Sequence, residues 1–231
     1  ALTADNITVT GATKGALTGS GTIRDLAISN ITVANGATVS VTITSPVGYS
    51  ITRSPQTAVV YRLLAVGVPH QGGVIAYIYQ SGDPGYVSGE THGLIAATAD
   101  QSTGVEWISG GSTQSTLVPG GTGTALGTGP ANTDRIIAQA VAAGNTTPAS
   151  YAAGLARAYN AGGYTDWYLP SKDELDKLCT NRVSIGGFAS DWYWSSSEAG
   201  TAYIAWSRYF GGGTMGGAKF GSWRVPAVRA F

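Results

Sequence analysis

The sequence is poor in cysteine, in charge and in long apolar runs. Cys179 is the only cysteine in 231 residues, which excludes an intrachain disulfide. Only 11% of the residues are charged, and 13 Lys and Arg balance 13 Asp and Glu. A nucleic-acid-binding surface needs an excess of cations, so we expect no nucleic-acid partner. The apolar stretch at 59–68 is interrupted by Arg62 and is too short to span a bilayer, so we expect no membrane insertion.

Metal-ligating and catalytic groups are also scarce. His70 and His92 are the only histidines, and neither stands at ligand spacing from another ligand type. The carboxylates of Asp173, Glu174 and Asp176 cluster where a helix is expected to begin, so we interpret them as capping and dipole-compensating groups. We therefore expect no metal and no cofactor.

Two further motifs suggest chemistry at first sight. The glycines of 121–129 are not followed by the Gly-Lys-Ser/Thr ending of a phosphate-binding loop, so we interpret this segment as a flexible loop. The serines of 195–197 lack the Gly-x-Ser-x-Gly pattern of a hydrolase nucleophile, and we expect a turn whose hydroxyls bond to its own backbone. The sequence thus predicts a protein that is not an enzyme.

Residues 1–62 show the patterns of strands and turns alone. Apolar and polar residues alternate over 39–44, which is the signature of a half-buried strand. Shorter β-rich runs occupy 7–10, 26–28 and 58–61. This spacing predicts a small, all-β, immunoglobulin-like sandwich that acts as a spacer or docking module.

Residues 63–231 mix helical and strand patterns. The run 74–79 predicts a buried strand, and 109–129 is rich in Gly, Ser and Thr and predicts a loop. Ile136, Ile137, Ala140 and Val141 share one helical face, with Gly144 at the expected end. A second helix is expected within 150–160, and a third starts at a capping box of Ser171 and Glu174. These helices precede a strand-rich tail, which predicts an α+β domain.

Three segments of this second part carry a resemblance to a known family. They are the run from Asp166 to Leu175 (DWYLPSKDEL), the run from Tyr193 to Glu198 (YWSSSE) and the ending from Val228 to Phe231 (VRAF). They resemble the C-type-lectin fold in its formylglycine-generating-enzyme-like branch, and most closely the variable proteins of diversity-generating retroelements. The resemblance covers 72–231 and implies that the first and last strands of the domain lie together.

The resemblance also bears on activity. The oxidase of that branch uses a pair of cysteines, whereas this chain has only Cys179. The calcium-dependent sugar-binding motifs of C-type lectins, Glu-Pro-Asn and Trp-Asn-Asp, are absent as well. The resemblance therefore implies ligand binding by the shared fold rather than oxidation or calcium-dependent sugar recognition.

In the resembled proteins, mutagenesis randomises the adenines of template codons of the form AAY, within a region that here corresponds to about 193–231. Such codons cannot yield Trp, Met, Lys, Glu or Gln. Trp206, Met215, Lys219 and Trp223 would then be fixed positions, although Trp223 is left open as a ligand contact because Trp is favoured at binding hot spots. The expected ligand-binding residues are Ala199, Gly200, Thr201, Ala202, Tyr203, Ile204, Ser207, Tyr209, Thr214, Gly216, Gly217, Ala218, Phe220, Gly221, Ser222 and Trp223.

The composition of this segment supports the same interpretation on physical grounds. Tyr, Ser and Gly are the residues that antibody binding surfaces favour, because Tyr supplies contact area at low entropic cost and Gly supplies shape. We expect a diversified receptor or adhesin that binds a protein or glycan, displayed on a virion, cell or other extracellular surface. The alternatives are an adhesin of the same fold with fixed specificity, an oxidase of the resembled branch, and a purely structural surface component.

Overall fold

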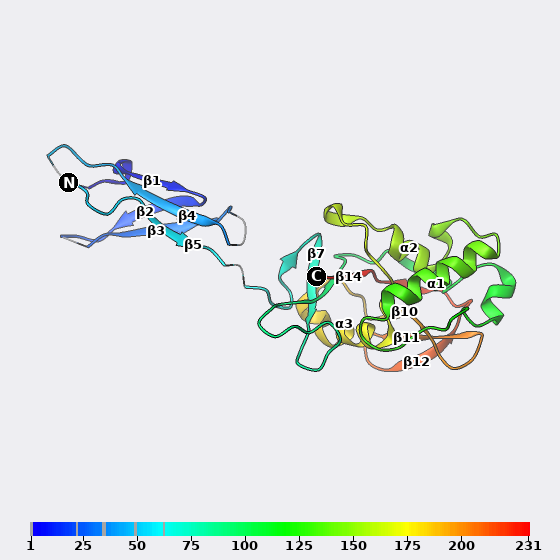
Figure 1. Ribbon diagram of the computed structural model, residues 1–231. Coiled ribbons are helices and arrows are strands. Elements are labelled where there is room, and N and C mark those ends of the chain that lie inside the picture. The colour runs from blue at the N-terminus through cyan, green and yellow to red at the C-terminus, as the bar shows by residue number, and fades with distance from the viewer. Residues whose placement is uncertain (1, 22, 34–35, 49, 62) are drawn as a thin grey trace. The chain divides into compact units, whose positions relative to one another are not determined.

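The computed structural model describes residues 2–21, 23–33, 36–48, 50–61 and 63–231, with the side chains of Thr214 and Met215 outside the description. The chain divides into two compact units, Ala1–Leu63 and Leu64–Phe231 (Figure 1). The predicted boundary at 62/63 lies one residue from this division.

The N-terminal unit consists of short antiparallel strands. β1 (Ile7–Thr10), β4 (Thr38–Ile43) and β5 (Gln56–Val59) form one sheet in the order β1-β4-β5, and β2 (Thr13–Thr18) pairs with β3 (Asp25–Ser29). A single 3-10 turn, Ala4–Asn6, precedes β1. The strands expected in this part are confirmed, whereas their assignment to an immunoglobulin-like sandwich stays a prediction. Ile7 and Val39 are the buried apolar side chains among the described residues of this unit.

The C-terminal unit contains two sheets. The first has the order β14-β8-β7-β6, and the second has the order β12-β11-β10-β13-β9. β14 and β7 both pair with β8, so the last strand lies in the same sheet as β7 but is separated from it by β8. The resemblance implied that the first and last strands lie together, and they share a sheet without pairing. The strands of this unit are β6 (Pro69–His70), β7 (Gly73–Ile78), β8 (Gly93–Ala96), β9 (Ser102–Val105), β10 (Trp192–Glu198), β11 (Ile204–Tyr209), β12 (Thr214–Ala218), β13 (Trp223–Val225) and β14 (Val228–Ala230).

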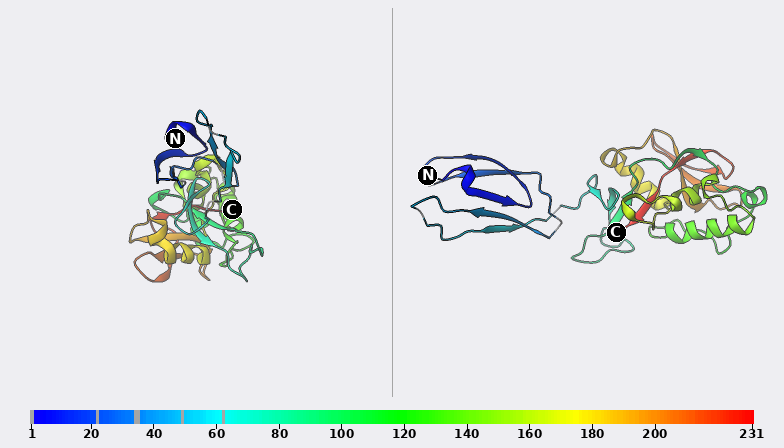
Figure 2. Two further views of the ribbon diagram at one scale, coloured as in Figure 1. Left: turned by 90° about the vertical axis from the view of Figure 1, so that its left-hand side faces the viewer. Right: turned by 90° about the horizontal axis from the view of Figure 1, so that it is seen from above.

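Helices cover these sheets. α3 packs against β7 of the first sheet and against β10 and β11 of the second, while α1 contacts β10 and α2 contacts β9 and β13. In the right-hand view of Figure 2 a long green helix lies along the lower edge of this unit, the orange segments lie toward the upper edge, and the red C-terminal strand runs between them to the C-terminus. The helices are α1 (Gly129–Ala142), α2 (Ala152–Ala158) and α3 (Lys172–Ile185), with 3-10 turns at Gly111–Ser115, Pro148–Ser150 and Ala161–Gly163.

The helix boundaries follow from local sequence chemistry. Ser171 Oγ accepts the backbone N–H of Glu174 while the Glu174 carboxylate accepts the N–H of Ser171, which confirms the predicted capping box. α1 ends just before Gly144, whose φ of 85° suits glycine at a helix C-terminus. The expected apolar face of α1 needs one correction, since Val141 is 50% exposed while Ile136 and Ala140 are fully buried.

The core of the C-terminal unit is built from aromatic rings. Trp107, Trp167 and Trp194 are fully buried in one apolar cluster, and Tyr168 and Tyr193 lie in a second cluster with residues of α3. No helix in the described part of the chain is long and apolar enough to cross a bilayer. The C-terminal unit thus shows the mixed helix and sheet content expected of a lectin-type domain.

Candidate ligand-binding surface

The predicted ligand-binding residues lie in the turn between β10 and β11, along β11 and β12, and in the turn that leads to Trp223 at the start of β13. β12 is an edge strand, and its register with β11 pairs Ile204 with Ala218, Ala205 with Gly217 and Trp206 with Gly216. Because successive side chains of a strand point to opposite faces, these residues divide between two faces of the sheet.

The most exposed of these residues lie in the turns. Tyr203 is 54% exposed and Phe220 is 62% exposed, although both are large and apolar in body. Gly200, Thr201 and Ser222 are exposed as well. Others are partly exposed, namely Ala199, Ala202, Ile204, Tyr209, Gly216, Ala218, Gly221 and Trp223.

Two of the predicted contacts do not lie on the surface. Ser207 is only 1% exposed, and Gly217 is buried beneath the indole ring of Trp223. A Cβ atom at Gly217 would lie 1.3 Å from Cη2 of Trp223, which leaves no room for any side chain. The expectation that these two residues touch a ligand is therefore corrected, because β11 and β12 turn them inward. The side chain of Thr214 lies outside the described residues, although its backbone belongs to β12.

The predicted fixed position Lys219 is buried in the framework. Its side chain is 0% exposed, and its Nζ lies 2.6 Å from Oε1 of Glu198 and 2.9 Å from the carbonyl oxygen of Thr116. The ammonium also lies 4.8 Å from the ring centroid of Trp107, where the π face attracts it. Burial lowers the pKa of Lys219, and the pairing with Glu198 opposes that shift.

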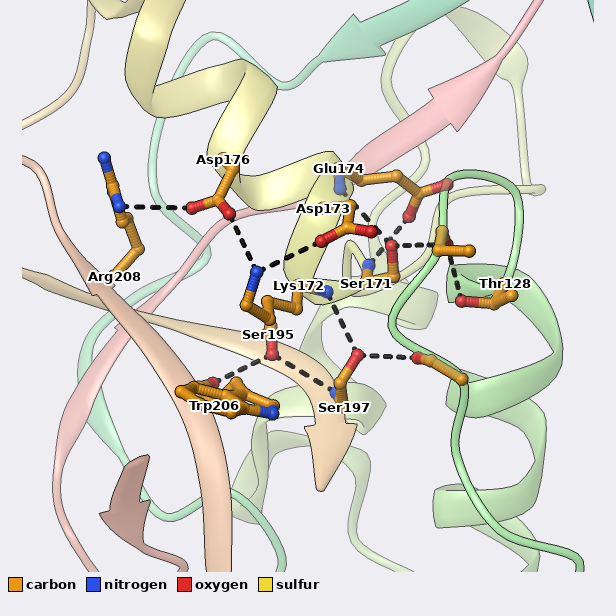
Figure 3. Close-up of polar contacts among 12 residues, drawn as sticks. Thr128, Ser171, Lys172, Asp173, Glu174, Asp176, Ser195, Ser197, Trp206 and Arg208 are labelled. Carbon is orange, nitrogen blue, oxygen red and sulfur yellow. Dashed lines mark hydrogen bonds and ion pairs between the residues drawn. The ribbon is translucent and has the colours of Figure 1, made fainter. Parts of the chain in front are cut away.

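The predicted fixed residues Trp206 and Trp223 also have framework contacts. Trp223 packs against Trp194 with a centroid distance of 3.9 Å. Lys172 Nζ lies 5.8 Å from the ring centroid of Trp206, and Ser195 Oγ donates to the Trp206 carbonyl oxygen at 2.8 Å (Figure 3). Trp194 is fully buried, whereas Trp206 is only partly buried.

The serines at 195–197 form no turn, and that expectation was wrong. They lie inside β10 and are fully buried. Ser197 Oγ accepts the backbone N–H of Lys172 at 3.0 Å and donates to the carbonyl oxygen of Gly123 at 2.7 Å, as Figure 3 shows. Asn132 donates to Ser196 Oγ at 3.2 Å. Together with the bond from Ser195 to Trp206, the three hydroxyls therefore join β10 to four other segments of the chain, namely β11, α1, α3 and the loop at Gly123.

The acidic cluster at the start of α3 has a structural role in the described contacts. Glu174 is buried, and its carboxylate accepts hydrogen bonds from the backbone of Ser171 (2.7 Å) and Gly127 (2.9 Å) and from Oη of Tyr168 (3.2 Å). Burial raises the pKa of Glu174, and these hydrogen bonds counteract that rise. Asp173 and Asp176 pair with Lys172 at 3.1 Å each. The capping interpretation is confirmed, and the glycine-rich loop is held by Glu174.

The histidines and the cysteine also have protein contacts. His70 stacks edge-on against Phe231 at 5.0 Å, and His92 lies 2.7 Å from Glu90. Cys179 is buried in α3. Within the described ranges, no group of three or more His, Cys, Asp or Glu side chains is placed to hold a metal ion.

Sequence reasoning missed two solvent-accessible apolar side chains, of which Trp192 contacts the predicted surface. The ring of Trp192 lies 5.4 Å from that of Tyr209 and 6.0 Å from that of Trp223, so it extends the aromatic row by one residue. Leu117 is 58% exposed in the loop before α1. Trp192 directly precedes a recognised motif and could have been included, whereas no local pattern marks Leu117.

The comparisons with known proteins agree with this architecture. A family model described as the Lcl C-terminal domain matches residues 96–229, which is more than half of the chain. A comparison with curated proteins found no match. The resemblance to C-type-lectin-like domains of diversity-generating retroelement variable proteins is thereby confirmed. The chain belongs to the Lcl C-terminal domain family.

Proposed function

We propose that this protein is a receptor or adhesin whose C-terminal unit binds a ligand without catalysis, through a surface that retroelement mutagenesis diversifies. The observation that carries the proposal is the alternation of exposed and buried positions between 199 and 223. Tyr203 and Phe220 are exposed, whereas Lys219, which AAY codons cannot produce, is fully buried and ion-paired. Replaceable residue types thus occupy these two exposed turns, and a residue type that this mutagenesis cannot produce is buried directly beside Phe220 in the sequence.

Membership in a C-type-lectin-like binding family supports the absence of catalysis in the proposal. The antiparallel strands of the N-terminal unit support its proposed role as an immunoglobulin-like spacer or docking module. Display on a virion, cell or other extracellular surface is the location that such a receptor requires, and it is part of the same proposal.

The test is deep sequencing of the 3′ end of this gene across one population. We expect substitutions at Gly200, Thr201, Tyr203, Phe220 and Ser222. Trp206, Lys219 and the buried positions Ser207 and Gly217 serve as internal controls and should stay constant among siblings that express folded protein. A uniform sequence throughout 199–223 would refute diversification and would favour an adhesin with fixed specificity.

A further inference from the structure

A cleft of about 370 Å³ lies at one end of the first sheet of the C-terminal unit, and we call it the sheet-end cleft. Tyr79 follows β7, His92 precedes β8 and Phe231 follows β14, so the antiparallel pairing of these strands brings all three residues to the same end. The loop between β7 and β8 adds Pro84 and Val87 to the lining. A cavity of about 150 Å³ can already hold benzene, so this cleft has room for a small ring with substituents.

Tyr79 brings an unpaired polar group to this cleft. The residue is only 9% exposed, yet in the part of the chain that the structure describes its Oη has no hydrogen-bond partner. Buried tyrosine hydroxyls usually have such a partner. Burial, followed by the carboxylates of Glu174 and Asp83, raises the pKa of Tyr79 to about 12. The hydroxyl therefore keeps its proton at neutral pH and can donate a hydrogen bond to a ligand.

The other lining groups determine which ligand suits the cleft. Both ring nitrogens of His92 are already paired, because Nε2 lies 2.7 Å from Oε2 of Glu90 and Nδ1 lies 3.2 Å from the carbonyl oxygen of Phe231. Among the described residues, no Lys or Arg lines the cleft, so an anionic ligand would find no cation there. A ligand with many hydroxyls would exchange its hydrogen bonds with water for a single side-chain partner. An uncharged ring with one hydrogen-bonding group fits these conditions.

The loop that lines the cleft is held by its own hydrogen bonds. Oδ2 of Asp83 accepts from Oη of Tyr77 at 2.6 Å and from the backbone N–H of Gln80 at 2.8 Å. Gly85 has a φ of 88°, and a Cβ atom there would lie 3.0 Å from Cε2 of Tyr79, so the loop backbone packs closely on this ring. The cleft is thus formed before a ligand arrives, which reduces the entropic cost of binding.

We propose that the sheet-end cleft is a second binding site, which takes an uncharged small molecule with one aromatic ring and one hydroxyl group, such as a phenol. The hydroxyl would bond with Oη of Tyr79, and the ring would pack against Phe231 and Val87. An aromatic ring suits this lining because aromatic pairs gain more than their buried area alone provides. The site goes beyond the proposed function, since none of its lining residues is among the predicted ligand-binding residues of 199–223.

The experiment titrates the full chain with p-cresol and with toluene, which lacks the hydroxyl, and follows the ring protons of His92 by NMR. We expect p-cresol to bind saturably with a Kd of about 1 mM or tighter, which is within reach of so small a ligand. Benzoate and methyl α-glucoside serve as the anionic and the sugar probe, and both should bind more weakly than p-cresol.

Three variants locate the site and test the hydroxyl. Tyr79→Phe keeps the ring and removes Oη, so it should weaken p-cresol about threefold to tenfold, as the loss of one hydrogen bond does, and leave toluene within about twofold. Tyr86→Phe is the matched control, because Tyr86 lies in the same loop, is 40% exposed and does not line the cleft. Val87→Trp places a large ring at a 44% exposed lining position and should abolish the binding of both compounds. Unchanged unfolding midpoints confirm that the variants fold.

Each part of the proposal has a result that would overturn it. Absence of saturable p-cresol binding, or binding that Val87→Trp leaves unchanged, would overturn the site itself. Equal weakening of p-cresol and toluene by Tyr79→Phe would overturn the role of the hydroxyl. Benzoate or methyl α-glucoside binding as tightly as p-cresol would overturn the assigned ligand class. None of these results bears on the proposed function, which depends on other residues and is tested by sequencing.

Discussion

The ion pair of Lys219 and Glu198 offers the sharpest test of how the framework holds the predicted surface. In the variant Lys219→Met, a side chain of similar length replaces the ammonium, so the carboxylate of Glu198 remains buried without its cation. Removing one partner of a buried ion pair typically costs about 3–5 kcal/mol. The side chains of Lys219 and Glu198 are 0% and 7% exposed, so solvent screens the remaining charge poorly and the full range applies.

The assay is urea unfolding followed by tryptophan fluorescence. All six tryptophans lie in Leu64–Phe231, so this signal reports on the C-terminal unit alone. The double variant Lys219→Met/Glu198→Gln is the matched control, because it removes both charges and keeps an oxygen that can accept the N–H of Val118. We expect it to be more stable than Lys219→Met, since no unpaired charge is left buried.

The stabilities of the single and the double variant together test whether an unpaired buried carboxylate causes the loss. A loss below about 1 kcal/mol for Lys219→Met would place the ion pair among solvent-screened surface pairs and would refute the reasoning. A double variant less stable than the single variant would show that the unpaired carboxylate is not the source of the loss.

Three further predictions concern other parts of the C-terminal unit. Gly217→Ala should displace the indole of Trp223 and lower the free energy of unfolding in urea by about 1–3 kcal/mol. The additional change Trp223→Phe should recover part of that stability. Equal stability of Gly217→Ala and the wild type would contradict the close packing of Trp223 over Gly217. In an NMR titration His92 should have a pKa above the ordinary 6.5, because Glu90 stabilises the protonated imidazole. The contribution of this pair to stability is present at low pH and is lost as pH rises through the pKa of His92 in the folded state. Glu90→Gln should lower the pKa of His92, and an unchanged pKa in that variant would refute the prediction. Ser197→Ala should cost about 1–3 kcal/mol, because it leaves the backbone N–H of Lys172 without its acceptor and the carbonyl oxygen of Gly123 with Asn132 as its remaining side-chain donor. The exposed control Ser112→Ala should be close to neutral.

The helices and strands could be predicted where a local pattern specified them. The capping box of Ser171 and Glu174 and the apolar positions Leu175 and Leu178 are written within a few residues of one another, and α3 begins where they predict. The strand at 195–197 was missed because β10 is buried on both faces, so its sequence shows no alternation of polar and apolar residues. The prediction placed Val141 on the buried face of α1, whereas this residue lies at the edge of that face.

The candidate surface could be predicted only in part, for a related physical reason. Its exposed turns were apparent from the resemblance and from composition. The inward orientation of Ser207 and Gly217 depends on the register of β11 with β12, which the local sequence does not specify. The pairing of Lys219 with Glu198 and with Thr116 joins residues far apart in the chain, so the local sequence does not specify it either.

The close fit of Trp223 over Gly217 has a consequence for how a randomised gene would use its variants. Mutagenesis of adenines acts on codons of inward-facing and outward-facing residues alike. A template with AAY at position 217 would therefore yield mostly chains in which a new side chain displaces the indole of Trp223. Each such position would reduce the fraction of offspring able to fold without adding any new specificity. Selection on the template should therefore remove adenines from the codons of inward-facing residues and retain them at the turns, so the nucleotide sequence of the template would itself record which side chains face outward.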